Sequence, residues 1–148
     1  MLGEGITLET TLMPMIWSIK AEPSQIGQII INMAINAYDA MQGEGRLTIE
    51  TSNVILDNNC KNRYLQAEPG EYIAWTISDT GAGISAEAKA HIFDPFFSTK
   101  ETERRPGFGL ATVLNIIKQH KGDISVDSQA GKGTTFRIYL PRSREPML

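Results

Sequence analysis

The stretch PSQIGQIIINMAINAYDAM (residues 23–41) decides the fold. Its apolar residues recur every three or four positions, which predicts a long helix with one apolar face. Pro23 stands at the expected first helical position, where its missing N–H group leaves no bond unmade. The following QGEG predicts the end of the helix. A helix with this face requires a second layer to pack against, and the flanking sequence predicts a sheet.

Apolar stretches with strand patterns surround this helix, at 5–10, 15–20, 46–56 and 71–79. Residues 123–129 and 134–141 predict a closing hairpin around AGKG, and 108–122 predicts a second amphipathic helix that ends at Gly122. Ser85 is expected to cap a short helix that runs through His91. Together these elements predict an α/β two-layer sandwich, in which about three helices cover one face of a mixed, largely antiparallel sheet.

The composition limits the classes of function. The 148 residues suit one domain, and a formal net charge of −3 argues against nucleic acid as the main partner. A single cysteine, Cys60, favours a reducing cytoplasm. Neither a membrane-spanning apolar run nor a signal peptide is visible. The first strand begins almost at once, so we expect residues 1–148 to be one domain of a longer protein.

Three amides, Gln28, Asn32 and Asn36, follow one another at intervals of four on the predicted helix, so they form one stripe along it. Buried amides require hydrogen-bond partners. Neighbouring backbone groups are one possibility. The other is a ligand site in which an amide oxygen coordinates Mg²⁺ that carries phosphates.

The sequence contains three closely spaced glycine pairs, and the first allows two interpretations. Asp79 ends a strand before Gly81 and Gly83, which predicts either a tight turn or a site where a carboxylate accepts a ligand N–H group. Gly107 and Gly109 precede a helix, whose N-terminal N–H groups favour an anion. The pair at 131 and 133 suits a hairpin turn.

The order of these motifs is more specific than any one of them. QIIINMAINAYDAM resembles the N box of the ATP-binding domain of sensor histidine kinases, in the GHKL ATPase/kinase superfamily. DTGAGI, IFDPFFSTK, GFGLATV and GKGTTFRIYLP resemble its first glycine box, F box, second glycine box and third glycine box. The resemblance covers the chain from about Ile6 to Pro141 and is nearest to nitrogen-regulator-like kinases.

This resemblance implies an ATP site with a flexible lid. Asp79 would accept a hydrogen bond from the adenine amino group, and Thr134 would line the same end. Asn36 would coordinate Mg²⁺, and Asn32 would lie near the phosphates. The other implied nucleotide-binding residues are Asp39, Gly81, Gly83, Ile84, Lys100, Gly107, Phe108, Gly109 and Leu110.

The resemblance also bears on the reaction. Asn32 and Lys100 are the implied catalytic positions, and hydrolytic relatives carry a glutamate at the position of Asn32. An amide is no general base, which favours γ-phosphoryl transfer to a histidine over hydrolysis. Neither His91 nor His120 suits the phosphoacceptor, so we expect that histidine on an upstream dimerisation domain, and we expect this chain alone to be inactive or nearly so. The implied partners are that domain and, indirectly, a response regulator; the fragment is expected to be monomeric and its parent homodimeric.

Two departures from the family pattern leave alternatives open. Arg105 and Pro106 replace the first glycine of the second glycine box, which motivates a second hypothesis of a nucleotide-binding regulatory module without phosphotransfer. Asp39 stands where many relatives carry a basic residue, and it either binds a magnesium water or is a solvated helix residue. Arg104 and Arg105 either reach the phosphates from the lid or form a solvated charge run.

Overall fold

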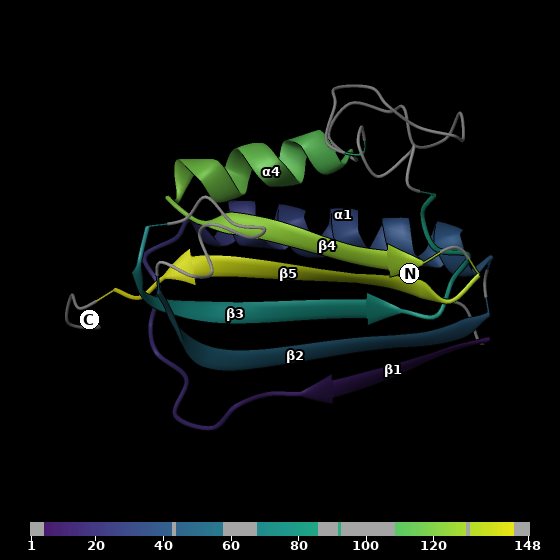
Figure 1. Ribbon diagram of the computed structural model, residues 1–148, viewed down its shortest axis with the longest axis horizontal. Coiled ribbons are helices and arrows are strands. Elements are labelled where there is room, and N and C mark those ends of the chain that lie inside the picture. The colour runs from purple at the N-terminus through teal and green to yellow at the C-terminus, as the bar shows by residue number, and fades with distance from the viewer. Residues whose placement is uncertain are drawn as a thin grey trace.

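The computed structural model describes residues 5–42, 44–57, 68–85, 92, 109–129 and 131–143. One five-stranded sheet, in the order β1-β2-β3-β5-β4, forms the base of the molecule (Figure 1). Its strands are β1 (Ile6–Thr11), β2 (Gly45–Leu56), β3 (Gly70–Asp79), β4 (Asp123–Gln129) and β5 (Gly133–Pro141). β1 pairs parallel to β2, and the three remaining pairs are antiparallel. The predicted mixed, largely antiparallel sheet is confirmed.

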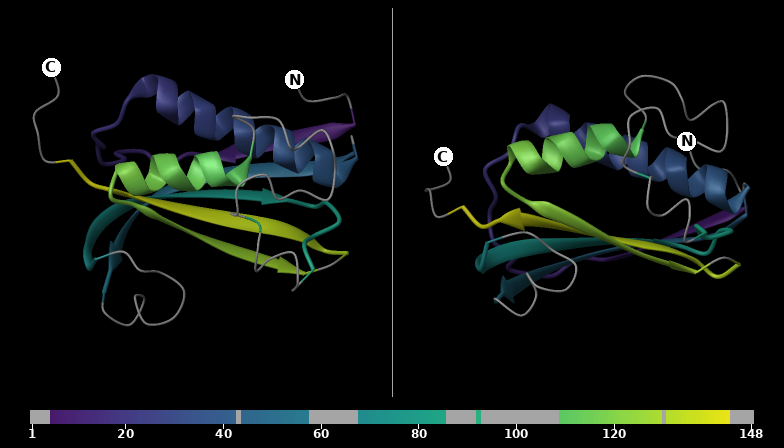
Figure 2. Two further views of the ribbon diagram at one scale, coloured as in Figure 1. Left: turned by 90° about the horizontal axis from the view of Figure 1, so that it is seen from above. Right: turned by 45° about the horizontal axis from the view of Figure 1, so that its top comes forward.

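Two helices in the described part of the chain, α1 (Pro23–Met41) and α4 (Leu110–Gln119), lie side by side on one face of the sheet (Figure 2). The core fills the space between the layers. It joins Ile29 and Met33 of α1 and Val113 of α4 to sheet residues such as Phe136 and Ile138. The two-layer sandwich is therefore confirmed, while the third predicted helix, which follows Ser85, falls outside the described residues.

The ends of α1 agree with its sequence. Glu22 is the N-cap with Pro23 at the first helical position, and the helix ends at Gln42 in a left-handed conformation with φ 54°. Pro23 fits because the first N–H groups of a helix have no partner within it.

The end of α4 corrects one prediction. Lys121, with φ 62°, adopts the left-handed conformation that we expected of Gly122. The N–H of Gly122 donates to the Ile117 carbonyl (2.9 Å) and that of Lys121 to the Lys118 carbonyl (3.0 Å), which is the Schellman pattern. Gly122 is glycine for another reason, because a Cβ there would overlap the Tyr139 carbonyl oxygen.

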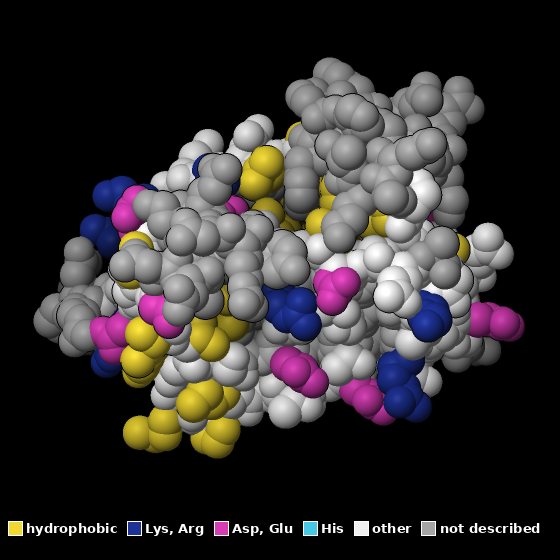
Figure 3. Space-filling view, viewed as in Figure 1, with side chains coloured by type: hydrophobic (Ala, Val, Ile, Leu, Met, Phe, Trp, Pro, Cys, Tyr) yellow, Lys and Arg dark blue, Asp and Glu magenta, His cyan; other side chains and the backbone are white. Residues whose placement is uncertain are grey.

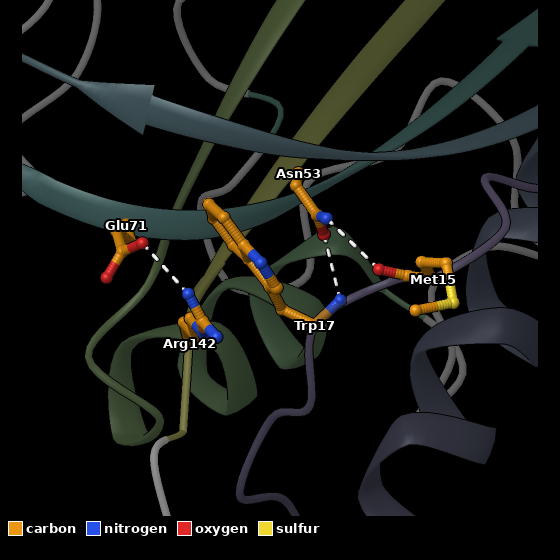
Figure 4. Close-up of polar contacts among 5 residues, drawn as sticks. All are labelled: Met15, Trp17, Asn53, Glu71 and Arg142. Atoms are coloured by element: carbon orange, nitrogen blue, oxygen red, sulfur yellow. Dashed lines mark hydrogen bonds and ion pairs between the residues drawn. The ribbon is translucent and has the colours of Figure 1, made fainter.

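The predicted strand at 15–20 is wrong. Residues 12–20, called the strap here, leave the end of β1 and pass to α1 without joining the sheet, except for an isolated bridge between Ile19 and Arg142. Asn53 of β2 holds this strap (Figure 4): its Oδ1 accepts from the Trp17 N–H (2.9 Å), and its Nδ2 donates to the Met15 carbonyl (3.4 Å). Met15 is left-handed, with φ 59°, which breaks the alternation that a strand requires.

The surface of the molecule agrees with its small net charge. Acidic and basic side chains are interspersed on the face seen in Figure 3, and no broad basic patch occurs among the side chains coloured there. No helix in the described ranges is long and apolar enough to cross a membrane.

Candidate functional site

Asp79 is the last residue of β3 and lies opposite Thr134 of β5. Residues directly opposite in an antiparallel pair place their side chains on the same face of the sheet. Both are buried, with exposed fractions of 8% for Asp79 and 4% for Thr134. Two polar side chains therefore meet at the edge where β3 ends.

Burial and hydrogen bonding act in opposite directions on the Asp79 carboxyl. Desolvation raises its pKa above the usual value, while backbone N–H groups of Gly81 and Thr134 lower it. The Gly81 N–H donates to Oδ1 at 2.8 Å. The carboxyl is thus held in place before any ligand arrives.

The DTGAGI loop lies directly on the C-terminal turn of α1. The Ala82 N–H donates to the Ala40 carbonyl at 3.0 Å. A Cβ on Gly81 would lie 2.6 Å from the carbonyl carbon and oxygen of Ala40, a distance that real Cβ atoms do not show. Gly83 has φ 76°, in the region that favours glycine, and Ile84 packs against the core. The loop therefore needs its glycines to lie against α1 and to turn.

A serine that we did not predict joins this loop to the third glycine turn. Ser128 of β4 accepts a hydrogen bond from the Ile84 N–H (2.7 Å), donates to the Gly133 carbonyl (3.0 Å) and contacts Thr134 Oγ1 (2.9 Å). The sequence carried a signal for it, because Ser128 follows Ile124 and Val126 in alternation and so puts a hydroxyl on a core-facing position.

The amide stripe reaches the start of α4. Asn32 is fully buried; its Nδ2 donates to the Gly109 carbonyl at 3.2 Å, and its Oδ1 accepts from Gln28 Nε2 at 2.7 Å. Gly109 is the N-cap residue of α4. Of the two interpretations of the stripe, hydrogen bonding to backbone holds for Asn32, and its partner is the motif in which we expected the phosphate site.

Asn36 lies one turn further along α1, half-buried, and its side chain makes no hydrogen bond within the described ranges. Its amide oxygen therefore remains available to a ligand. Asp39 is also half-buried, just before Ala40. Because Asn32, Asn36 and Ala40 follow at intervals of four, they share one face of the helix. That face joins Gly109 at one end to the DTGAGI loop at the other.

Among the described residues, a Cβ on Gly109 would meet only the Ala111 nitrogen, at 3.9 Å, and the φ of −86° suits any residue. Neither crowding by these residues nor the backbone geometry requires glycine at this position. Leu110, the next residue, packs against the core.

Other predicted site residues fall outside the described part of the chain: Lys100, Arg104, Arg105, Gly107 and Phe108. The same holds for the predicted lid, 92–107, apart from Ile92, which is buried in the core. Within the described ranges no group of three or more His, Cys, Asp or Glu side chains forms a metal site.

The described arrangement suits an elongated ligand with different ends. Asp79 supplies a buried acceptor for N–H groups at one end. Gly109 begins a helix at the other, where backbone N–H groups and the helix dipole favour negative charge. Asn36 lies between them on α1.

Comparisons with known proteins show the family of the chain. The family described as "Histidine kinase-, DNA gyrase B-, and HSP90-like ATPase" matches residues 21–144. Sensor kinase CckA of Brucella abortus is 41% identical over 142 residues, which are 96% of this chain and 15% of that protein. Sensor histidine kinase ZraS of Klebsiella oxytoca is 35% identical over 139 residues, which are 94% of this chain and 27% of that protein.

Among solved structures, the catalytic domain of histidine kinase ThkA superposes with a TM-score of 0.72 at 24% identity, covering 93% of this chain and 80% of that one. At this identity the likeness supports the fold. The chain spans about a quarter or less of the two curated relatives, so it corresponds to one part of such proteins. It belongs to the histidine kinase-, DNA gyrase B- and HSP90-like ATPase family, as an ATP-binding catalytic domain of the sensor histidine kinase type.

Proposed function

We propose that this chain holds Mg-ATP and presents its γ-phosphoryl group to a histidine on another domain of a longer sensor kinase. One observation carries the proposal: a single face of α1 contacts both the DTGAGI loop, at Ala40, and the start of α4, at Asn32. Eight residues separate these contacts, about 12 Å along a helix. An extended nucleoside triphosphate spans such a distance.

The base end is assigned to Asp79, whose carboxylate accepts from the adenine amino group. Gly81, Gly83 and Ile84 form the wall beside the base, and Thr134 lines the same end. The support is the burial of Asp79 and its fixed position against the Gly81 N–H. An ionised carboxylate only accepts hydrogen bonds, so it suits an amine.

The phosphate end is assigned to the start of α4, with Gly107, Phe108, Gly109 and Leu110. The support is that no described residue crowds Gly109, because a ligand explains a glycine that the described fold does not require. Asn32 acts there through its bond to the Gly109 carbonyl and so positions the backbone. Lys100 remains a prediction for the phosphate tail.

The residues on this part of α1 offer oxygen atoms that suit Mg²⁺. Asn36 offers an amide oxygen without a side-chain partner in the described ranges, and Asp39 lies three residues further on. Mg²⁺ commonly takes one or two protein ligands and completes its shell with phosphates and water. When bound, it would neutralise phosphate charge.

The reaction type follows from Asn32. Its amide cannot take a proton from water at neutral pH, and both its oxygen and its nitrogen already hold partners. The domain therefore positions ATP for transfer to another nucleophile and does not activate water. Residues 1–148 form one domain of the parent, and the histidine lies in the parent's dimerisation domain.

The remaining parts of the proposal concern the parent protein. It is a homodimer that passes the phosphoryl group to a response regulator, and this domain works in the cytoplasm. The names of the relatives, which are sensor kinases, support this setting. Kinship with nitrogen-regulator-like kinases stays a prediction.

Labelled ATP tests the proposal. The chain is mixed with the parent's phosphoacceptor domain, and the label is followed into protein in acid-stable and acid-labile form. We expect acid-labile histidine phosphate only when both parts are present. Tight ATP binding without transfer would favour the second hypothesis, a regulatory nucleotide-binding module, which Arg105 and Pro106 motivate. Steady ATP turnover by this chain alone would contradict the argument from Asn32.

A further inference from the structure

Ser128 occupies a position that neither the family motifs nor the proposed catalytic roles include. It is half-buried near the end of β4, beside the turn at 131–133. Its one hydroxyl contacts three groups from two motifs: the Ile84 N–H of the first glycine loop, and the Gly133 carbonyl and Thr134 hydroxyl of the third. The two walls at the base end of the site therefore meet at this oxygen.

The three contacts fix the direction of each hydrogen bond. A serine hydroxyl has one proton and two lone pairs. The Ile84 N–H can only donate, so it uses one lone pair; the Gly133 carbonyl can only accept, so it takes the proton. One lone pair remains for Thr134, so the Thr134 hydroxyl must donate to Ser128.

This assignment determines what Thr134 offers to a ligand. Its only hydroxyl proton points to Ser128, so Oγ1 presents lone pairs alone. Asp79 stands opposite on β3 and is also an acceptor when ionised. The base end therefore carries two acceptors, and the proton of the Thr134 hydroxyl is taken by Ser128.

We propose that Ser128 is a positioning residue that sets the base selectivity of the site by holding the Thr134 hydroxyl as an acceptor. The inference rests on the proposed ATP site. Two acceptors favour a purine whose six-position carries an amino group over one that carries a carbonyl. A free Thr134 hydroxyl would rotate and donate to such a carbonyl, so selectivity would be lost.

The test compares ATP with inosine triphosphate, which differs at the six-position and at the neighbouring ring nitrogen. Binding of both is measured by calorimetry on the wild-type chain, on Ser128→Ala and on Ser128→Thr. We expect Ser128→Ala to lower the ratio of ATP to inosine triphosphate affinity by about tenfold, the equivalent of about one hydrogen bond. Ser128→Thr keeps the hydroxyl and should keep the ratio.

A matched control lies one strand away. Ser78 and Thr135 form a similar hydroxyl pair across β3 and β5, at 3.0 Å, one position from Asp79 and Thr134. Their side chains point to the other face of the sheet because successive residues alternate. Ser78→Ala should therefore leave the ratio at its wild-type value.

A second variant covers the case in which Ser128→Ala does not fold. Thr134→Val removes the hydroxyl and should lower the ratio by itself. Where Ser128→Ala does fold, adding it to Thr134→Val should change the ratio no further. If the wild-type chain prefers ATP and a folded Ser128→Ala or Thr134→Val keeps the same ratio of ATP to inosine triphosphate affinity, the role of Ser128 is overturned. The proposed function would then still stand. A wild-type chain that binds neither nucleotide would overturn the proposed function, and this inference with it.

Discussion

The site glycines are needed for different reasons, and the difference can be measured residue by residue. At Gly81 a Cβ would meet the backbone of Ala40 at 2.6 Å, and backbone cannot rotate away. Among the described residues, a Cβ at Gly109 would meet nothing closer than 3.9 Å. The first glycine serves the fold. The second, by our proposal, serves the ligand.

Two alanine substitutions test this distinction. Gly81→Ala should destabilise the fold by about 1–3 kcal/mol, the usual range for overpacking. Gly109→Ala should leave the thermal midpoint nearly unchanged and weaken ATP binding, because a methyl group would stand where phosphate approaches. Thermal unfolding and calorimetry measure the two effects. If Gly109→Ala bound ATP with wild-type affinity, the assignment of the phosphates to the start of α4 would be wrong.

Asp79 should make the affinity for ATP fall at acidic pH; this fall is called the acidic limb of the affinity profile. Burial raises the pKa of this carboxyl, so a contribution to stability is fully present below the pKa of the unfolded chain and is lost as pH rises through the folded value. Above the raised pKa the free domain thus holds an ionised group that burial disfavours. The adenine amine requires that ionised form, so ATP affinity should fall as pH falls through the raised pKa.

Asp79→Asn supplies the comparison. It should weaken ATP binding about tenfold or more at neutral pH, the equivalent of one charge-assisted hydrogen bond, while changing the unfolding free energy much less. Its affinity should also lack the acidic limb of the wild type. Because ATP itself titrates equally in both experiments, an acidic limb common to both proteins would show that Asp79 is not the titrating group.

At the scale of the element, the end of α4 carries avoidable strain. Lys121 holds the left-handed position of the Schellman motif, where glycine has no steric penalty. Lys121→Gly should therefore stabilise the domain by about 0.5–1 kcal/mol in urea unfolding, despite the greater freedom of glycine in the unfolded chain. Lys121→Ala, which keeps a Cβ, is the control and should give no such gain. A loss of stability in Lys121→Gly would show that the lysine side chain matters more than its backbone.

The elements show how far the sequence predicts the fold. α1 was predicted with its observed bounds because Pro23 marks its start and its apolar spacing is strong. Residues 15–20 were mistaken for a strand because their alternation is real but short. In the structure Met15 is left-handed, and a single isolated bridge at Ile19 replaces the row of hydrogen bonds that a strand would form. The parallel pairing of β1 with β2 also had no local signal, because it depends on where the strap and α1 return the chain.

The sequence offered candidate site residues one by one, without the contacts between them. Asp79 and Thr134 were assigned to one end by resemblance, and their pairing follows from the β3–β5 register. The bond between Asn32 and Gly109 joins residues 77 positions apart, which no local pattern predicts. Ser128 was missed because only the glycine pair beside it, at 131 and 133, was interpreted. Lys100 and Gly107 stay predictions.

At the scale of the whole molecule, the two ends of the described chain are fastened together. The strap near the start and Ser143 near the end meet through the Ser143 N–H, which donates to the Ser18 carbonyl at 2.7 Å. Arg142 adds side-chain contacts on both sides: its guanidinium lies 4.4 Å from the centre of the Trp17 ring and 2.9 Å from the Glu71 carboxylate (Figure 4). One arginine thus links the strap, β3 and the end of β5.

Arg142→Ala should therefore destabilise the molecule by about 1–2 kcal/mol, as the sum of a partly buried ion pair and a cation–π contact. Arg142→Lys keeps the charge but not the planar stacking, and should fall between alanine and wild type. The control is Arg46→Ala, because Arg46 pairs with Glu9 at 3.5 Å while both side chains are at least half exposed, and a pair of that kind contributes little. Urea unfolding of the three variants decides the point. If Arg142→Ala were as stable as Arg46→Ala, the hydrogen bonds of Asn53 and the backbone bonds near Ser143 would suffice to hold the strap. The arginine would then be a surface contact only.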